Sequence, residues 1–431
     1  MISQLTAAVA ALSLWSGASA ATPSIPLLKS LVASPQDACK LAAGPQGRKE
    51  AGFDLGGNNV KSTGTLKGWM MFVDFPDAQT NGSDSQALFD THAAAVSQFY
   101  QTSSYGKLSV ELSADTQQVY RMPSISTSYG WADGLKPYYL EMYIQDALDA
   151  YMHAHNADGD ASVLPEMDVL YLIPPPTADF FNSNTFMYEP EIRVPNAGGN
   201  GTVGNDTTAT NGTAGTAVAH RAIAFGHDIF HEDGYKVLVH ETGHTMGLPD
   251  YYLTDGSELP GALVGGFSLM AVTFEQAPDF FAYDKWRMGW MADSAVHCIT
   301  EKGSTTHVLS PLEKKVEGSE STQAVVVATS GTTALVAEAR TKNGVDDELC
   351  GAGVLLYTVD SNVPSGQGPV RIINGLDSDL RWCGGYPSNL APLSFTKPRK
   401  SSLTVEKWGI TVTLTEHDEV TDNWTIKVDY K

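Results

Sequence analysis

The 431-residue chain has little positive charge. It contains 27 Lys and Arg residues against 49 Asp and Glu residues, for a formal net charge of −22. Nucleic acid and anionic membrane surfaces repel such a chain, so we expect neither as a partner. Beyond the N-terminus the sequence also lacks an apolar run of the roughly 20 residues that a membrane span needs. These absences, with no internal repeat of fixed period, predict a soluble globular protein.

The N-terminus predicts export. Residues 1–20, "MISQLTAAVAALSLWSGASA", form an apolar run that ends in the small-x-small pattern Ala18-Ser19-Ala20, which is typical of a signal-peptide cleavage site. Lys and Arg are missing near the start, so the positively charged region of this signal is weak. A buried N-terminal helix is the alternative. We expect a secreted, extracellular monomer.

Cysteine is also scarce, and the few cysteines fit secretion. An even number can form two disulfides by any of three pairings: Cys39, Cys298, Cys350 and Cys383. Acceptor sites for N-glycosylation, Asn-x-Ser/Thr, are frequent: Asn81, Asn200, Asn205, Asn211 and Asn423. Together with the signal peptide, these sites indicate a secreted glycoprotein.

The pattern along the chain predicts an α+β fold. Residues 21–66 are rich in Pro, Gly and small residues, which is typical of an N-terminal extension or propeptide. Between 67 and 297, strand-like and helix-like segments alternate, which favours a mixed sheet with helices packed on it. From 298 to 431, short strand-like runs separated by turn residues predict a β-rich, sandwich-like C-terminal domain.

The segment "KVLVHETGHTMGLPDYY", residues 236–252, carries the chemistry. On a helix, His240 and His244 project from one face, so that their imidazole nitrogens can converge on one ion. Gly247 stands where a helix ends in a left-handed residue, and this turn lets Asp250 reach back as a third ligand. Three protein ligands with a fourth position open are typical of a catalytic zinc site.

Glu241 stands next to the first predicted ligand. Zinc lowers the pKa of a bound water toward about 7, so a neighbouring carboxylate can take a proton from it and pass the proton to a leaving amine. The residues therefore indicate peptide-bond hydrolysis with Glu241 as the general base. Met270 follows Asp250 by twenty residues, and a methionine in a tight turn beneath the metal is a second mark of metzincin-type peptidases.

The sequence resembles the immune inhibitor A family of secreted bacterial and fungal metallopeptidases. The similar segments run in order from about Gly68 to Asp360 and include "GWMMFVDFPD", "VHETGHTMGLPDYY", "GGFSLMAV" and "AYDKWRMGW". The resemblance implies a zincin-like catalytic domain with a twisted mixed sheet and an active-site helix. It also implies a zinc endopeptidase that acts on proteins or peptides, with zinc on the two histidines and Glu241 as the base.

Several assignments stay open at this point. The third zinc ligand is Asp250, or a later carboxylate such as Glu275 or Asp284. An oxyanion-stabilising tyrosine has three candidates, which the sequence does not distinguish: Tyr251, Tyr252 and Tyr283. His227 and His231 precede the motif and either line the cleft or serve as ordinary loop histidines.

A second metal follows from the resemblance, because members of this family often carry an Asp-rich calcium loop. The segment "HNADGDASVLPEMDVL" offers alternating oxygen donors around a glycine, as calcium requires: Asn156, Asp158, Asp160 and Asp168. A solvated turn is the alternative.

Two further alternatives concern latency and activity. Cys39 is either half of a disulfide or the thiolate that caps zinc in a zymogen. The even number of cysteines favours the disulfide, since a cysteine switch leaves three others and one of them unpaired. In place of a peptidase, the chain could be a catalytically silent secreted binding or adhesion protein that keeps the fold. The presence of Glu241 favours the peptidase, because a purely structural metal site has no use for a base there.

Overall fold

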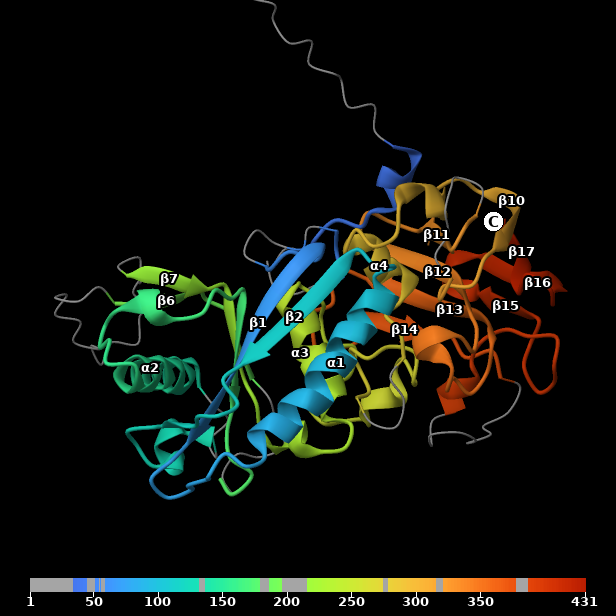
Figure 1. The fold of residues 1–431 in the computed structure, drawn as a ribbon. Helices are drawn as coiled ribbons and strands as arrows, with labels where there is room; N and C mark the ends of the chain where they lie inside the picture. Colours follow the sequence, from blue (N-terminus) through green and yellow to red (C-terminus); the bar gives the residue numbers. More distant parts are fainter. Residues whose placement is uncertain are drawn as a thin grey trace, which may run out of the picture. The chain divides into compact units, whose positions relative to one another are not determined.

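In the computed structural model, the N-terminal half of the chain folds around a mixed six-stranded sheet with the main path β2-β1-β4-β8-β5. The first four strands on this path are parallel, β5 is antiparallel to β8 at one edge, and β3 pairs with the end of β1. Figure 1 shows β1 and β2 side by side. The strands are β1 (Gly64–Asp74), β2 (Leu108–Ala114), β3 (Tyr120–Arg121), β4 (Val169–Ile173), β5 (Phe186–Tyr188) and β8 (Arg221–Ala224). The structure describes residues 34–44, 51–53, 55, 59–131, 136–178, 186–195, 215–273, 278–314, 321–376 and 387–431.

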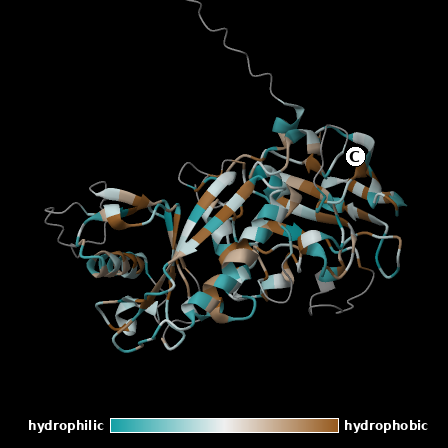
Figure 2. Ribbon diagram, viewed as in Figure 1, coloured by the Kyte–Doolittle hydropathy of each residue, from teal (hydrophilic) through white to brown (hydrophobic). Residues whose placement is uncertain are grey.

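From Gly68 to Val73, the strand β1 is apolar and buried, because both faces of the sheet are covered there. Its side chains alternate between two cores, with Met70 and Phe72 on one face and Trp69 and Met71 on the other. The first face packs against α1 (Ser85–Ser103) and α3 (Gly234–Thr245), and the second against α2 (Pro137–Ala154). In Figure 2, α1 shows bands of both colours, as expected of a helix that buries one face.

Two further sheets make up the second half of the chain. One has the order β14-β13-β12-β11-β9 and the other the order β10-β17-β16-β15. The strands of the first are β9 (Val296–Ile299), β11 (Ala324–Ala328), β12 (Thr333–Arg340), β13 (Gly353–Asp360) and β14 (Val370–Ile372). Those of the second are β10 (Gly303–Leu309), β15 (Ser402–Val405), β16 (Ile410–Asp418) and β17 (Asn423–Tyr430). The strands β6 (Ile192–Val194) and β7 (Thr216–Ala219) form a separate antiparallel pair. The fold is therefore α+β, as predicted.

The five-stranded sheet belongs to two cores at once. In β13, Leu356 faces the four-stranded sheet, whereas Leu355 and Tyr357 belong to the same buried cluster as α1 and α3. The strands β11 and β12 alternate in the same way. The predicted boundary between residues 297 and 298 falls inside β9, and residues Pro35–Lys431 form one compact unit. One continuous core thus extends across the predicted boundary.

The described part of the predicted extension, residues 21–66, also joins this core. Cys39, Leu41, Ala51 and Val60 are buried in the same cluster as α1 and α3. Cys39 forms a disulfide with Cys298, 259 residues further along the chain, and this bond argues against a zinc-capping thiolate at Cys39. Cys350 is also disulfide-bonded, whereas Cys383 and the predicted signal peptide lie outside the described residues. Within the part of the chain that the structure describes, no helix is long and apolar enough to cross a membrane.

A buried charged network joins β12 to the segment before α4 (Ala282–Arg287). The Arg340 guanidinium is fully buried and donates to Asp346 at 2.7 Å and to Glu338 at 3.1 Å. It also donates to the backbone oxygen of Phe267 at 3.0 Å. Glu338 in turn accepts from the backbone N–H of Ala282, the first residue of α4. The network thus fixes the chain on both sides of Met270.

Candidate metal centre

The helix α3 is buried along nearly its whole length and is held from two sides. The Tyr100 hydroxyl of α1 donates to the backbone oxygen of Val239 at 2.7 Å. The Tyr171 hydroxyl of β4 lies 2.9 Å from the Thr242 hydroxyl. Because a helix and a strand both anchor α3, its orientation relative to the sheet is fixed on either side of His240.

The end of α3 explains how the chain turns back over the helix. The N–H of Gly247 donates to the oxygen of His244, and the N–H of Leu248 donates to the oxygen of Gly243. These two bonds form a Schellman motif, which requires a left-handed residue. Gly247 supplies it with a φ of 101°. The turn predicted at Gly247 is therefore present, and it directs Asp250 toward the helix.

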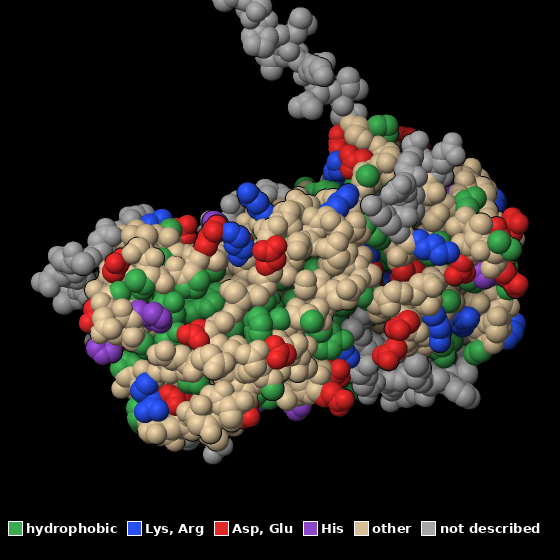
Figure 3. Space-filling view, viewed as in Figure 1, with side chains coloured by type: hydrophobic (Ala, Val, Ile, Leu, Met, Phe, Trp, Pro, Cys, Tyr) green, Lys and Arg blue, Asp and Glu red, His purple; other side chains and the backbone are tan. Residues whose placement is uncertain are grey.

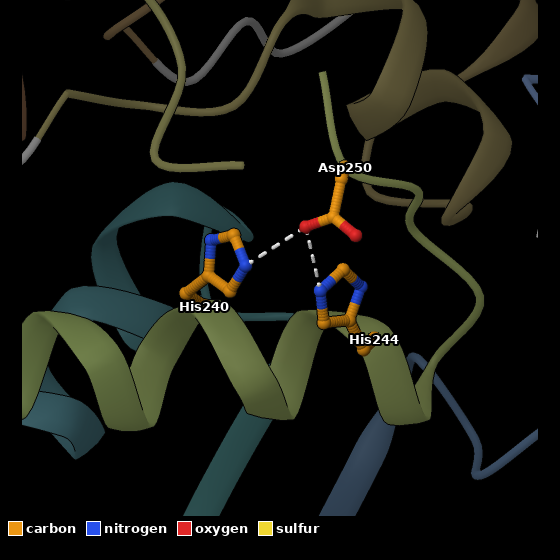
Figure 4. Close-up of side chains that lie close together, drawn as sticks. All are labelled: His240, His244 and Asp250. Atoms are coloured by element: carbon orange, nitrogen blue, oxygen red, sulfur yellow. Dashed lines mark hydrogen bonds and ion pairs between the residues drawn. The ribbon is translucent and has the colours of Figure 1, made fainter. Parts of the chain in front are cut away.

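The side chains of His240, His244 and Asp250 meet at one point (Figure 4). Asp250 Oδ1 lies 3.2 Å from His240 Nε2 and 3.1 Å from His244 Nε2. Among the described residues this is the one group of three or more His, Cys, Asp or Glu side chains close enough to hold a metal ion. The structure thus brings together the three residues that the sequence predicts as ligands.

The hydrogen bonds behind the two histidines determine which nitrogen faces Asp250. His240 Nδ1 lies 2.8 Å from the oxygen of Leu269, and His244 Nδ1 lies 2.7 Å from the oxygen of Leu248. A carbonyl oxygen only accepts, so both Nδ1 atoms carry the hydrogen and both Nε2 atoms of the neutral rings present a lone pair. Two lone pairs and a carboxylate oxygen in contact repel one another unless a cation lies among them. Two imidazoles and one carboxylate fit a metal ion such as zinc.

The electrostatics of the three side chains also favour positive charge at this point. Burial lowers the pKa of His240, but its bond to Asp250 and the charges of Glu241 and Asp250 outweigh burial and raise the pKa to about 9. Burial raises the pKa of Asp250, but the two histidines outweigh it and hold the pKa well below its usual range. A proton on the imidazole thus provides the charge that a metal ion would otherwise provide.

Met270 lies directly under the helix that carries the ligands. A Cβ atom on Gly243 would lie 2.9 Å from the Met270 sulfur, so the missing side chain at Gly243 makes room for it. The backbone oxygen of Met270 accepts from the N–H of Tyr251, and its neighbour Leu269 supplies the carbonyl for His240. The segment around Met270 therefore supports His240 from below and fixes the residue after Asp250.

The structure distinguishes the three tyrosine candidates. The Tyr251 hydroxyl is bonded to the buried Asp284 carboxylate, and Tyr283 packs in the core against Phe53. Tyr252 is half-buried, with its ring centroid 6.4 Å from that of His240. Burial and the nearby carboxylates of Asp250 and Glu241 raise its pKa, so Tyr252 keeps its proton. Of the three, only Tyr252 belongs to the site.

The structure also distinguishes two of the three candidates for the third ligand. Asp284 is buried in the core, where the Arg287 guanidinium lies 3.5 Å from its carboxylate. It does not belong to the histidine group. Glu275 lies outside the described residues. The geometry therefore favours Asp250.

Glu241 follows His240 on α3 and has 9% of its surface exposed. Its charge acts on both His240 and Tyr252, which places the carboxylate in the same electrostatic environment as the histidine–aspartate group. It is not a member of the ligand group itself. This placement is compatible with a base beside the metal rather than a fourth ligand.

One contributor to the site was missed by the sequence analysis. The Ser365 hydroxyl contacts both the backbone and the side chain of Asp250, although 115 residues separate the two in the chain. Ser365 follows β13 in the β-rich half. A polar residue in a Pro- and Gly-containing turn carries no local signal of such a contact, so only the tertiary structure reveals it.

Three of the four proposed calcium donors use their side chains elsewhere. Asp158 contacts His153, Asp160 accepts from the N–H of Ser162, and Asp168 accepts from the N–H of Lys67. Asn156 adopts a left-handed backbone conformation with a φ of 55°. The calcium site stays a prediction without added support from these contacts.

Two glycosylation sites fall among the described residues. Asn81 is exposed in the turn before α1, and Asn423 is half-buried at the start of β17. The other three lie outside the described residues: Asn200, Asn205 and Asn211.

A separate cavity of about 350 Å³ lies at the carboxyl ends of β1 and β4, beside the start of α1. Apolar side chains such as Leu88 and Phe230 line it together with His231. Hydrophobic side chains reach the surface on the face shown in Figure 3.

None of the three candidate ligands lines this cavity, and His227 belongs neither to the cavity lining nor to the histidine–aspartate group. Neither of the two loop histidines is a member of the histidine–aspartate group.

Comparison of the sequence with models of known families gives no match, and no curated protein is significantly similar to it. The assignment of function therefore depends on the geometry and on the motif.

Proposed function

We propose that this protein is a secreted, zinc-dependent endopeptidase with a zincin-like catalytic region. The observation that carries the proposal is the convergence of two imidazole Nε2 atoms on one carboxylate oxygen, Asp250 Oδ1, at 3.2 Å and 3.1 Å. Both Nδ1 atoms are already bonded to backbone carbonyls. The order of motifs similar to the immune inhibitor A family supports the same class. Zinc at these ligands would supply a Lewis acid and an acidified water.

In this proposal, each residue of the site has a separate role. Glu241 accepts the proton of the attacking water and passes it to the nitrogen of the leaving amine. Tyr252 keeps its phenolic proton and donates a hydrogen bond to the oxyanion that develops on the scissile carbonyl. His240, His244 and Asp250 hold the cation, and the carbonyl oxygens of Leu269 and Leu248 keep the two rings in the required tautomer.

The sheet offers a place for an extended substrate. Among the described strands, β5 stands at one edge of the mixed sheet, runs antiparallel to its neighbour β8 and lies beside α3. An edge strand presents backbone groups that can pair with an added peptide strand. We propose that the substrate backbone aligns along β5, so that the scissile bond comes to the histidine–aspartate group.

Removal of the metal should abolish peptidase activity. We expect purified full-length protein to bind one zinc per chain and to lose casein cleavage on treatment with 1,10-phenanthroline, because the Lewis acid is removed. Added Zn²⁺ should restore cleavage. Elemental analysis and a casein assay measure both effects. The isomer 1,7-phenanthroline, which does not chelate, is the control and should leave activity unchanged. Cleavage that persists after the zinc is removed, or zinc-loaded protein that cleaves no protein substrate, would refute the proposal.

Replacement of Tyr252 by Phe should slow turnover without releasing the metal. Loss of one oxyanion donor typically lowers kcat by about 100-fold, and we expect an effect of this order with little change in KM. Steady-state kinetics on a fluorogenic peptide measure it. Tyr138→Phe, on the exposed surface of α2, is the control. If Tyr252→Phe keeps the wild-type kcat, Tyr252 has no part in stabilising the oxyanion.

A further inference from the structure

The turn that connects β13 to β14 lies against the segment that carries Asp250. The N–H of Gly366 donates to the oxygen of Asp250 at 3.1 Å, and the N–H of Thr254 donates to the oxygen of Gly366 at 3.0 Å. Between these bonds, Leu253 and Gln367 form an antiparallel bridge. The chain just beyond the helix end is thus paired, strand-like, with a turn of the β-rich half.

The shape of this turn is adapted to the contact. Gly366 has a φ of 74°, a left-handed conformation that favours glycine. A Cβ atom at Gly366 would lie 2.5 Å from the Thr254 hydroxyl. The backbone of the turn can therefore approach Thr254 this closely because residue 366 has no side chain.

The Ser365 hydroxyl has a single possible hydrogen-bond arrangement here. The backbone N–H of Asp250 donates to Ser365 Oγ at 2.8 Å, so Oγ is the acceptor of that bond. The one hydroxyl proton is then available to Asp250 Oδ2, 3.1 Å away. Oδ2 is occupied by this bond, and Oδ1 is the oxygen that faces the two histidines.

We propose that Ser365 is a positioning residue for the third metal ligand, and that the β-rich half thereby sets the metal affinity of the site. This inference rests on the proposed metal site. Hydrogen-bonded partners behind metal ligands typically change metal affinity by 10- to 100-fold. Here the partner is the Ser365 hydroxyl, and it orients the Asp250 carboxylate. Asp250 lies beyond the end of α3, so no helix holds its backbone in place. Within the described part of the chain, the hydrogen bonds of the Ser365 hydroxyl both go to Asp250, so the role that we propose for it is orientation and not catalysis.

The test compares Ser365→Ala with Ser361→Ala in the full chain. Ser361 lies in the same connection, and its hydroxyl is bonded to the oxygen of Thr332, away from the site. Zinc affinity is measured by competition with a chromophoric chelator, and denaturant unfolding of the metal-free proteins reports on folding. We expect Ser365→Ala to bind zinc about 10- to 100-fold more weakly, with metal-free unfolding unchanged. Ser361→Ala should keep the wild-type affinity, and Ser365→Thr should recover most of it through its hydroxyl.

The outcomes distinguish the two proposals. If the wild-type protein and Ser365→Ala bind zinc equally well, Ser365 does not position the ligand, and the peptidase proposal stays intact. Equal weakening by Ser361→Ala and Ser365→Ala also overturns it, because a general loosening of the turn then explains the effect. Wild-type protein that binds no zinc overturns the metal site and this inference together.

Discussion

Glu241→Gln should lose nearly all peptidase activity while keeping its zinc. The amide has the size of the carboxylate but cannot accept a proton from the attacking water. General acid–base groups contribute about 100- to 10,000-fold to rate, and we expect a loss in kcat near the upper end because Glu241 both accepts and returns the proton. Peptide turnover and elemental analysis on the same preparation measure the two effects.

The control for this substitution is Glu232→Gln, an exposed glutamate just before α3. It should keep wild-type turnover. If Glu241→Gln retains turnover, Glu241 is not the base. If the variant loses its zinc instead, Glu241 contributes to metal binding, which its position outside the histidine–aspartate group does not suggest.

Arg340→Met should be the most destabilising single substitution that we propose. The guanidinium is surrounded by the carboxylates of Asp346, Glu338 and Glu313, each with at most 1% of its side chain exposed. Burial lowers the pKa of Arg340, but these negative charges outweigh burial and raise it above its usual value. Removing one partner of a buried ion pair leaves uncompensated charge and typically costs about 3–5 kcal/mol. Denaturant unfolding should show a loss of this size.

Arg371→Met is the matched control, because Arg371 is exposed on β14 and bonds only to nearby backbone oxygens among the described contacts. Its free energy of unfolding should stay within about 0.5 kcal/mol of wild type. Equal stability of the two variants would mean that the buried carboxylates are protonated or solvated without Arg340. The geometry of the candidate metal centre should also change in the Arg340 variant, because the guanidinium holds the Phe267 carbonyl close to the Met270 turn.

Local patterns predicted the elements that carry the site. The apolar run "GWMMFVDFP" coincides with β1, "MDVLYLIPPP" with β4, and the histidine motif with α3. These predictions hold because side-chain periodicity and glycine stops act over a few residues, and the ligand spacing is fixed once the helix is assigned. The predicted ligands converge for the same reason.

Contacts between distant segments could not be predicted in this way. Nothing near Ser365 in the sequence indicates a bond to Asp250, and nothing near Tyr251 or Tyr252 shows which faces the core. The charged residues of β12 carry no local signal of burial, yet Arg340 and Glu338 are fully buried and bonded to each other. Their positions depend on the pairing of strands far apart in the chain, which periodicity does not encode.

The disulfide between Cys39 and Cys298 limits what proteolytic maturation can remove. A cut before Ser34 would release only residues that precede the buried cluster. A cut after Leu41 would leave a short N-terminal peptide bound through the Cys39 sulfur and through the buried side chain of Leu41. Such a product is a two-chain protein rather than a shortened one, and the peptide would leave only under reducing conditions. If maturation occurs by a cut on the C-terminal side of Cys39, it therefore divides the chain in two without releasing the Cys39-containing peptide in an oxidising environment.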